Sequence, residues 1–412
     1  MKKLNTFTLS GLMIGPILGS GVVLLPPIAI SILGEQAIFA WIIIMLLGIV
    51  FAYVFAKMSL LISSNEGMST VVGQSLGQSY RELASNYLTA AVCFGPVAVL
   101  LTASEFLSYL VKDLGLDKTG LAFILLILCV TVILRGITTV GKLTLILSSL
   151  TAVLLVIGSI YSLLTQSEIF YPTEIPEPGK LGYTLLLLFW AIIGWEVIGN
   201  YVEEVDRPEV TIMRAMKISI GAIIIVYLFS AFALQNRIQL TEAQGTESNL
   251  SLILVPLFGN FAYVLMGIIA AGLCFCTLLM ILGAVTRQIA VRAENGKLPA
   301  FLKMKPQEKA PKRALFVLTG WHSILLILIY LKLLSIEEIV GIANTFFIGN
   351  ALLGLSASIK YMKSFWVKAF VLFLIIALAV LLAFSSPFAW IALIVITMLS
   401  IYKNKKDTFV TE

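Results

Sequence analysis

The chain has 412 residues, of which 59% are hydrophobic and 12% are charged, and its mean hydropathy is +1.02. Soluble domains carry about 25% charged residues, so this composition excludes a soluble protein with a water-facing surface. The formal charge of +6 does not indicate a nucleic-acid partner, because the basic residues fall in alternate connections between apolar segments, as membrane topology requires.

Apolar segments long enough to cross a bilayer follow one another from end to end. Because only helices satisfy every backbone group within one segment, we expect an all-α, polytopic membrane protein in the lipid bilayer. About twelve transmembrane helices are predicted, at 8–31, 37–62, 86–110, 120–136, 143–164, 181–202, 216–234, 260–291, 314–331, 337–359, 367–384 and 388–402. Lys2 and Lys3 precede the first span without a cleavage site at the right distance after it, so we expect a retained helix.

The distribution of basic residues predicts the orientation. If the N-terminus is cytoplasmic, 23 of the 28 Lys and Arg residues lie on the cytoplasmic side. The other five, on the outer side, are Lys112, Lys118, Lys180, Arg237 and Lys332. This asymmetry predicts a multi-pass protein of the cytoplasmic (inner) membrane with both termini in the cytoplasm.

The first span contains Gly15-Pro16, Gly19-Ser20-Gly21 and Pro26-Pro27. Glycine costs about 1 kcal/mol and proline about 3 kcal/mol inside a helix relative to alanine, so the span is weakest at mid-membrane depth. An unwound segment there must line a cavity or be buried in protein. Its free N–H groups, together with the helix dipole, attract a carboxylate. Packing glycines are the alternative explanation.

Two connections are longer than a simple turn. Residues 63–85 are expected to form a small interfacial segment on the cytoplasmic side. Residues 235–259, on the outside, return to an apolar stretch at Leu252–Phe258. Either connection is a candidate gate or a surface connector.

The sixth span repeats the interruption, in Phe189-Trp190-Ala-Ile-Ile193-Gly194-Trp195-Glu196. Glu196 stands near the middle of an apolar helix, where an acid must face a cavity or a partner, or be protonated. Interruptions in the first and sixth spans are what an inverted repeat of five plus five helices predicts, with the substrate between them. The chain is expected to form one domain, with repeats at about 8–164 and 181–359 and two additional helices at 367–402.

Other polar residues lie inside apolar spans. Glu105 in the third span is a candidate for a coupling proton or an interfacial ion pair. His322, the only histidine, is expected to be an interfacial anchor beside Trp321, although histidine can titrate near neutral pH. Asn344 and Asn350 are candidates for the pathway or for interhelical hydrogen bonds. A single histidine and four cysteines within apolar segments predict neither a metal site nor a cofactor.

These motifs resemble the amino acid–polyamine–organocation (APC) family of amino-acid transporters. The resemblance rests on Gly19-Ser20-Gly21…Pro26, on Phe189-Trp190…Gly194-Trp195-Glu196 and on Ala293-Glu294-Asn295-Gly296-Lys297-Leu298-Pro299. It implies a leucine-transporter-like fold and alternating access. Glu294 and Asn295 depart from the family's Arg and Asp, which leaves the gating contacts at that end of the eighth span open.

The resemblance also implies a binding site for an amino-acid substrate. Its carboxylate is expected on the amides of Ser20 and Gly21, next to Gly19, and its ammonium on the carbonyls of Ile17, Trp190 and Ile193. The ring of Trp190 is expected to stack over the substrate. For Trp190 and Trp195 the alternative is a packing or lipid-facing role, and for Glu196 it is a structural hydrogen bond.

The coupling ion remains open in the sequence. Some proton-coupled relatives carry a lysine midway along the fifth span, and here the span 143–164 has no basic residue. Thr277 is the obvious hydroxyl for a sodium site. Proton coupling through Glu196 or Glu105, sodium coupling and plain exchange are all compatible with these residues.

A neutral, hydrophobic amino acid is the expected substrate, because the residues near the interruptions, Glu196 apart, are apolar. Cationic amino acids or polyamines are the alternative. A channel would need a continuous polar lining, and a membrane enzyme would need a catalytic cluster, so neither is expected. A non-transporting amino-acid sensor with the same fold, and a monomer or homodimer, remain open.

Overall fold

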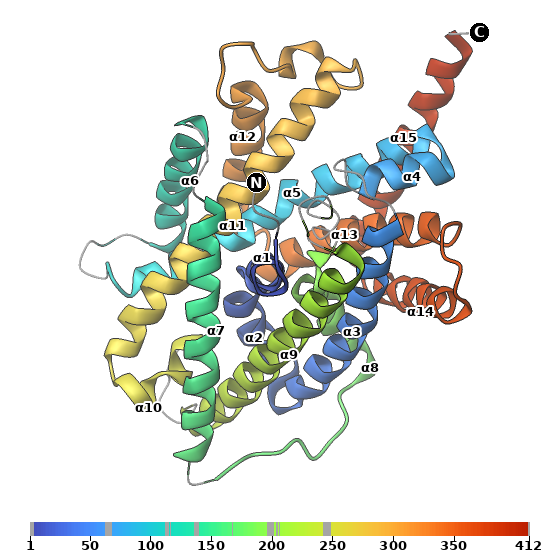
Figure 1. Cartoon of the computed structure of the whole chain (residues 1–412). Helices are drawn as coiled ribbons and strands as arrows, with labels where there is room; N and C mark the ends of the chain where they lie inside the picture. The colour runs from blue at the N-terminus through green and yellow to red at the C-terminus, as the bar shows by residue number, and fades with distance from the viewer. Residues whose placement is uncertain are drawn as a thin grey trace.

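The structure is a computed structural model that describes residues 4–61, 68–111, 115, 117–135, 140–166, 168–195, 202, 205, 207–241 and 249–410. These residues are helical apart from their connections and one isolated bridge between Leu4 and Val205. The all-α prediction is therefore confirmed for the described chain (Figure 1).

Seven α-helices make up the first part of the chain. They are α1 (Thr6–Leu18), α2 (Gly21–Leu33), α3 (Ala37–Leu61), α4 (Met68–Leu76), α5 (Gln78–Ser108), α6 (Lys118–Arg135) and α7 (Val140–Leu164), with the 3₁₀ helix η1 (Gly34–Gln36) between α2 and α3.

Eight more α-helices follow. They are α8 (Pro178–Leu188), α9 (Pro208–Thr241), α10 (Val255–Phe258), α11 (Phe261–Glu294), α12 (Lys312–Tyr330), α13 (Ile336–Ser358), α14 (Phe365–Leu382) and α15 (Pro387–Val410). Short 3₁₀ helices stand at η3 (Phe189–Ile192), η6 (Leu250–Ile253) and η7 (Ala300–Leu302).

The helices are long and apolar enough for a polytopic membrane protein. Within the described ranges, nine helical stretches meet the length and hydropathy of a membrane span, and one of these runs through α2, η1 and α3. Three shorter apolar helices, at Thr6–Gly15, Pro178–Ile192 and Pro387–Ile401, account for the remaining apolar segments. Two of these three precede the interruptions in the first and sixth predicted spans.

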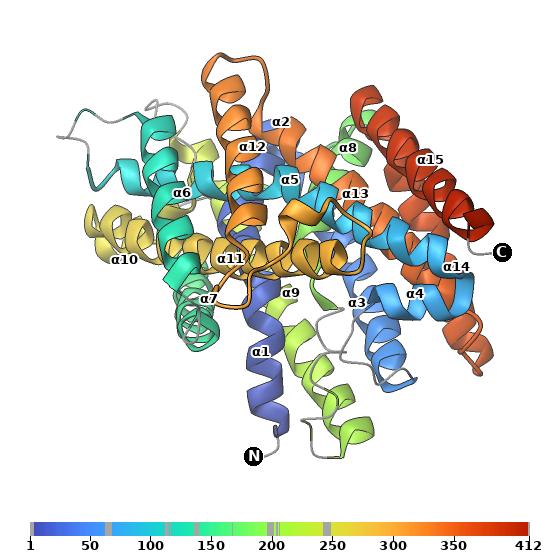
Figure 2. The ribbon, with the colours of Figure 1, turned by 90° about the horizontal axis from the view of Figure 1, so that it is seen from above.

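Helices from distant parts of the sequence pack together in the centre. Helix α5 packs against both α11 and α13, while α9 packs against α1, α3 and α7. Figure 2 shows α5 and α11 crossing the middle of the molecule. The interior is therefore assembled around α1, α2, α5 and α9.

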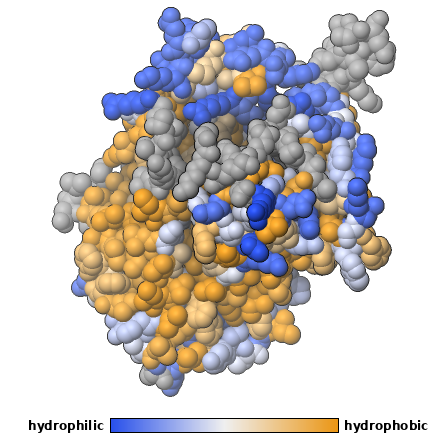
Figure 3. Space-filling model, viewed as in Figure 1, coloured by the Kyte–Doolittle hydropathy of each residue, from blue (hydrophilic) through white to orange (hydrophobic). Residues whose placement is uncertain are grey.

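The outer surface is largely apolar, as contact with lipid requires. Large hydrophobic side chains point outward on many helices, among them Leu46, Ile127, Val153, Ile268 and Phe373. Figure 3 shows a broad hydrophobic area on one side, with hydrophilic residues gathered at the top of the view, over the connection between α11 and α12.

The two long connections contain helices where they are described. The predicted interfacial segment 63–85 includes α4 and the first turns of α5, which begins at Gln78, eight residues before the predicted span. The apolar stretch at Leu252–Phe258 forms the end of η6 and the single turn α10. The prediction of gating at either place stays untested.

Candidate functional site

The first predicted span is two helices. Helix α1 ends at Leu18, α2 begins at Gly21, and Gly19 between them has φ +23° and ψ −134°. This backbone conformation favours glycine because a side chain there would be strained. Ser20 follows at the N-cap, where its hydroxyl is buried and has no hydrogen-bond partner among the described residues.

Free backbone groups of both kinds gather at this break. The first amides of α2 have no acceptor within the helix, which leaves the N–H groups of Gly21 and Val22 available. Pro26 and Pro27 lie inside α2 and lack an N–H, so the carbonyls of Val22 and Val23 lose their regular donors. A zwitterion could therefore find donors and acceptors within one helical turn.

Tyr227 on α9 contacts this break from the side. Its hydroxyl donates a hydrogen bond to the Ile17 carbonyl at 3.2 Å, and its fully buried ring stacks on Trp41 with 4.9 Å between centroids. Tyr227 is not among the residues that the sequence motifs indicate. Its signal in the sequence is a tyrosine in the middle of an apolar span, since a buried tyrosine hydroxyl usually needs a partner.

The second break follows α8. The α-helix ends at Leu188, continues as η3 to Ile192, and then Ile193 is extended (φ −79°, ψ 146°) and Gly194 has φ +116°. The interruption predicted for the sixth span therefore lies at Ile193 and Gly194, where Gly194 turns the backbone out of the helix. Glu196 lies outside the described residues.

Asn344 on α13 bonds to two carbonyls at the end of α8, just before this break. Its side-chain amide donates to the carbonyls of Leu186 and Leu187, at 2.8 Å each. Asn344 is fully buried, and its Oδ1 has no partner among the described residues. Of the two sequence interpretations of Asn344, the interhelical hydrogen bond is the one that the structure shows.

The two breaks touch each other. A Cβ built on Gly194 would lie 3.1 Å from Cγ1 of Ile17. The ring of Trp190 is packed between Gly21 and Gly95. A Cβ built on Gly21 would lie 3.4 Å from the Trp190 ring, and one built on Gly95 would lie 2.7 Å from it. Trp190 and Trp195 are buried, so the lipid-facing alternative for both is excluded.

Two cavities adjoin the breaks. One of about 210 Å³ is lined by Val23 in the first turn of α2 and, among others, by Thr102, Glu105, Asn249 and Glu337. The other, about 20 Å³, is the size of a single water site and is lined by Phe51, Phe55, Phe189, Ile193, Phe347, Asn350 and Ala351. The larger cavity lies toward the predicted external end and the smaller one toward the predicted cytoplasmic end.

The remaining predicted residues have different surroundings. Glu105 borders the larger cavity and forms an ion pair with Lys118 at 3.3 Å. Thr277 lies on α11, where its hydroxyl donates to the Leu273 carbonyl of its own helix. Their roles in coupling stay predictions. The prediction of an interfacial His322 is wrong, because His322 is fully buried and bonded to the Val92 carbonyl of α5.

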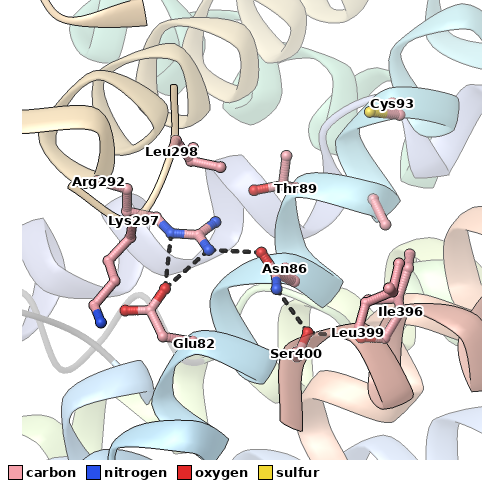
Figure 4. A pocket seen from close by; sticks show the side chains of 11 residues that line it. Glu82, Asn86, Thr89, Cys93, Arg292, Lys297, Leu298, Ile396, Leu399 and Ser400 are labelled. Atoms are coloured by element: carbon pink, nitrogen blue, oxygen red, sulfur yellow. Dashed lines mark hydrogen bonds and ion pairs between the residues drawn. The ribbon is translucent and has the colours of Figure 1, made fainter. Parts of the chain in front are cut away.

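A polar network links α5, α11 and α15 at the predicted cytoplasmic end (Figure 4). Arg292 donates to Glu82 at 2.9 Å and to the Asn86 Oδ1 at 2.6 Å, and Asn86 donates to Ser400 at 2.7 Å. The network borders a cavity of about 350 Å³ that Lys297 and Leu298 also line. Arg292 precedes by two residues the position where Glu294 departs from the family motif.

Replacing Arg292 with Gln is expected to lower the melting temperature of the purified protein. The Glu82 and Arg292 side chains are about nine-tenths buried (12% and 11% exposed), and a charged hydrogen bond contributes about 1.5–3 kcal/mol. Lys180→Gln is the matched control, because its pair with Glu177 is 62% and 66% exposed and surface pairs contribute little. Equal thermal shifts for the two variants would contradict the assigned strength of the network.

Comparison with known proteins agrees with this architecture. A family model described as "Amino acid permease" matches residues 4–406. The chain is 20% identical to the uncharacterized amino acid permease YecA of Bacillus subtilis (strain 168), over 85% of this chain and 83% of the relative. It is 23% identical to the L-methionine/branched-chain amino acid exporter YjeH of Escherichia coli (strain K12), over 86% and 84%.

A third relative has another substrate class in its name. The chain is 25% identical to the cadaverine/lysine antiporter of Escherichia coli (strain K12), over 80% of this chain and 76% of the relative. Because the family model covers nearly the whole sequence, the all-helical membrane chain belongs to the amino acid permease family of APC transporters and is not an enzyme.

Proposed function

We propose that the protein is a secondary transporter that moves neutral, hydrophobic amino acids across the cytoplasmic membrane by alternating access. The observation that carries this proposal is the contact between the two helix breaks, where Ile17 meets Gly194 and Gly21 meets Trp190. Broken helices whose free backbone groups face one another are the substrate site of transporters built from inverted repeats. A leucine-transporter-like arrangement, with repeats at 8–164 and 181–359, is part of the proposal.

In this mechanism the substrate carboxylate binds the amides of Ser20 and Gly21, where the α2 dipole adds a partial positive charge. The substrate ammonium binds carbonyls at Ile17, Trp190 and Ile193. Tyr227 donates to Ile17 in the described structure, and a carbonyl oxygen has two lone pairs, so the hydroxyl and an ammonium can share it.

The side chains around the second break favour a neutral substrate. They are aromatic or aliphatic apart from Asn350, and the space between them now is only the size of a water molecule. A cationic side chain in such a place would lose its hydration without a counter-charge, which is costly. The exporter for methionine and branched-chain amino acids among the relatives agrees with this choice.

Cationic amino acids or polyamines are the second candidate class. The larger cavity carries Glu105 and Glu337, which attract cations, and one relative is a cadaverine/lysine antiporter. Since Glu105 is already paired with Lys118, the neutral substrate remains our proposal.

Uptake by reconstituted protein tests the function. Proteoliposomes are expected to take up labelled methionine, leucine, isoleucine or valine in a saturable manner, and lysine and cadaverine at least about tenfold more slowly. Each substrate is measured with a proton gradient, with a sodium gradient and with internal unlabelled substrate, which distinguishes proton coupling, sodium coupling and exchange. Empty liposomes give the background.

Three results would contradict the proposal. Preferred uptake of lysine or cadaverine would support the second class. Amino-acid binding without flux would indicate a sensor, and unsaturable conductance would indicate a channel.

A further inference from the structure

Helix α5 carries a proline in its interior. Pro96 lies within α5, which continues as an α-helix from Gln78 to Ser108. Proline has no N–H, so the carbonyl four residues earlier, that of Val92, loses its helical donor. In a lipid environment an unsatisfied carbonyl is costly, and neighbouring helices commonly supply the missing partner.

His322 of α12 supplies this partner. Its Nε2 lies 2.9 Å from the Val92 oxygen, and the residue is fully buried. Because a carbonyl can only accept, Nε2 must carry the proton. The other ring nitrogen, Nδ1, is buried and has no partner among the described residues. This arrangement describes a neutral imidazole in the Nε2–H tautomer.

The backbone next to Pro96 also contacts Trp190 in the candidate substrate site. Gly95, the preceding residue, faces Trp190 so closely that a Cβ there would lie 2.7 Å from Cη2 of the indole and 3.7 Å from Ala343. Trp190 in turn packs on Gly21 at the first break. The backbone that His322 holds is therefore one turn or less from the surface that positions Trp190.

We propose that His322 is a positioning residue for the substrate site. It donates to the Val92 carbonyl that Pro96 leaves free, and it thereby holds the Gly95–Pro96 backbone against Trp190. The role needs the ring as a fixed donor and does not need it to change its protonation state. The transport consequence rests on the proposed function, whereas the hydrogen bond and its dependence on Pro96 do not.

The tautomer gives the first test, which is independent of transport. The chain has one histidine, so protein made with ¹⁵N-labelled histidine and without a histidine tag gives one set of imidazole signals. We expect a protonated, hydrogen-bonded Nε2 and a bare Nδ1. A proton on Nδ1 with a bare Nε2 would overturn the proposal.

A double-mutant cycle gives the second test. His322→Leu is expected to lower the melting temperature by a few degrees, and His322→Gln, which keeps a donor, to lower it less. In the Pro96→Ala variant, residue 96 again has an N–H that can bond to the Val92 carbonyl. Adding His322→Leu to that variant should therefore lower the melting temperature little. An equal drop in melting temperature with and without Pro96 would show that His322 acts independently of Pro96, and would overturn the proposal.

Transport kinetics distinguish a role of His322 in positioning the substrate site from a role in protein stability alone. With equal amounts of folded protein, His322→Leu is expected to raise KM about fivefold, the factor that corresponds to one hydrogen bond, and His322→Gln to restore it. An unchanged KM would leave His322 with a purely structural role. If the unaltered protein transports no amino acid, the proposed function fails, while the tautomer and the double-mutant cycle still decide the pairing of His322 with Pro96.

Discussion

Gly21→Ala is expected to reduce amino-acid uptake at least about tenfold while the protein still reaches the membrane. The new Cβ would lie 2.7 Å from the Tyr227 hydroxyl, a separation that forces one of the two to move. The hydroxyl has little freedom, because its ring is buried and stacked on Trp41. Overpacking of this kind costs about 1–3 kcal/mol, and it falls on the amide that we assign to the substrate carboxylate.

Two control variants distinguish the clash with the Tyr227 hydroxyl from the general effect of replacing a helix glycine with alanine. Gly221→Ala on α9 adds the same methyl group where no side chain and no other backbone segment lies within 4 Å, apart from its own turn of helix and its chain neighbours, so uptake should be unchanged. Adding Tyr227→Phe to Gly21→Ala removes the overlapping oxygen and should recover part of the uptake. Normal uptake by Gly21→Ala, measured as initial rates in proteoliposomes, would remove the first break from the substrate site.

Asn344→Leu is expected to have the second largest effect, on stability and on transport together. The change leaves the carbonyls of Leu186 and Leu187 without the donor they have now. Interhelical hydrogen bonds in membranes contribute about 0.6 kcal/mol on average and up to about 1.7 kcal/mol, so two bonds from one side chain suggest about 1–2 kcal/mol. Because these carbonyls lie within one turn of η3, which contains Trp190, uptake should fall several-fold even at temperatures where the protein stays folded.

Asn350→Leu is the matched control for Asn344→Leu. It removes an amide from the same helix α13, two turns further along, where Asn350 borders the small cavity. Its melting temperature should stay within about one degree of the unaltered protein, whereas that of Asn344→Leu should fall by several degrees. Equal thermal shifts would mean that the bonds to Leu186 and Leu187 contribute no particular stability.

One physical theme connects the interruptions of the helices. Several backbone carbonyls near these interruptions receive a donor from another helix: Ile17 from Tyr227, Leu186 and Leu187 from Asn344, and Val92 from His322. Water is absent from the bilayer core, so the protein itself must supply these partners. The breaks are thereby held in one arrangement and can present the remaining free groups to a substrate.

Several features of this protein followed from the sequence alone. The length and spacing of the apolar segments determined an all-helical membrane protein, because only a helix satisfies its backbone in lipid. Gly19 and Gly194 marked the two breaks, since both need backbone angles that other residues avoid. The motifs around them indicated the family, which the match over residues 4–406 confirms.

Only the tertiary structure decided which side chains complete the breaks. Tyr227 and Ile17 are 210 residues apart, and His322 and Val92 are 230 residues apart, so no local pattern joins them. The neighbouring Trp321 suggests in the sequence that His322 lies at the membrane interface, yet the packing of α12 on α5 buries it. Hydropathy reports how deep a residue can lie in the membrane, but which helices are neighbours depends on how their side chains fit together in three dimensions.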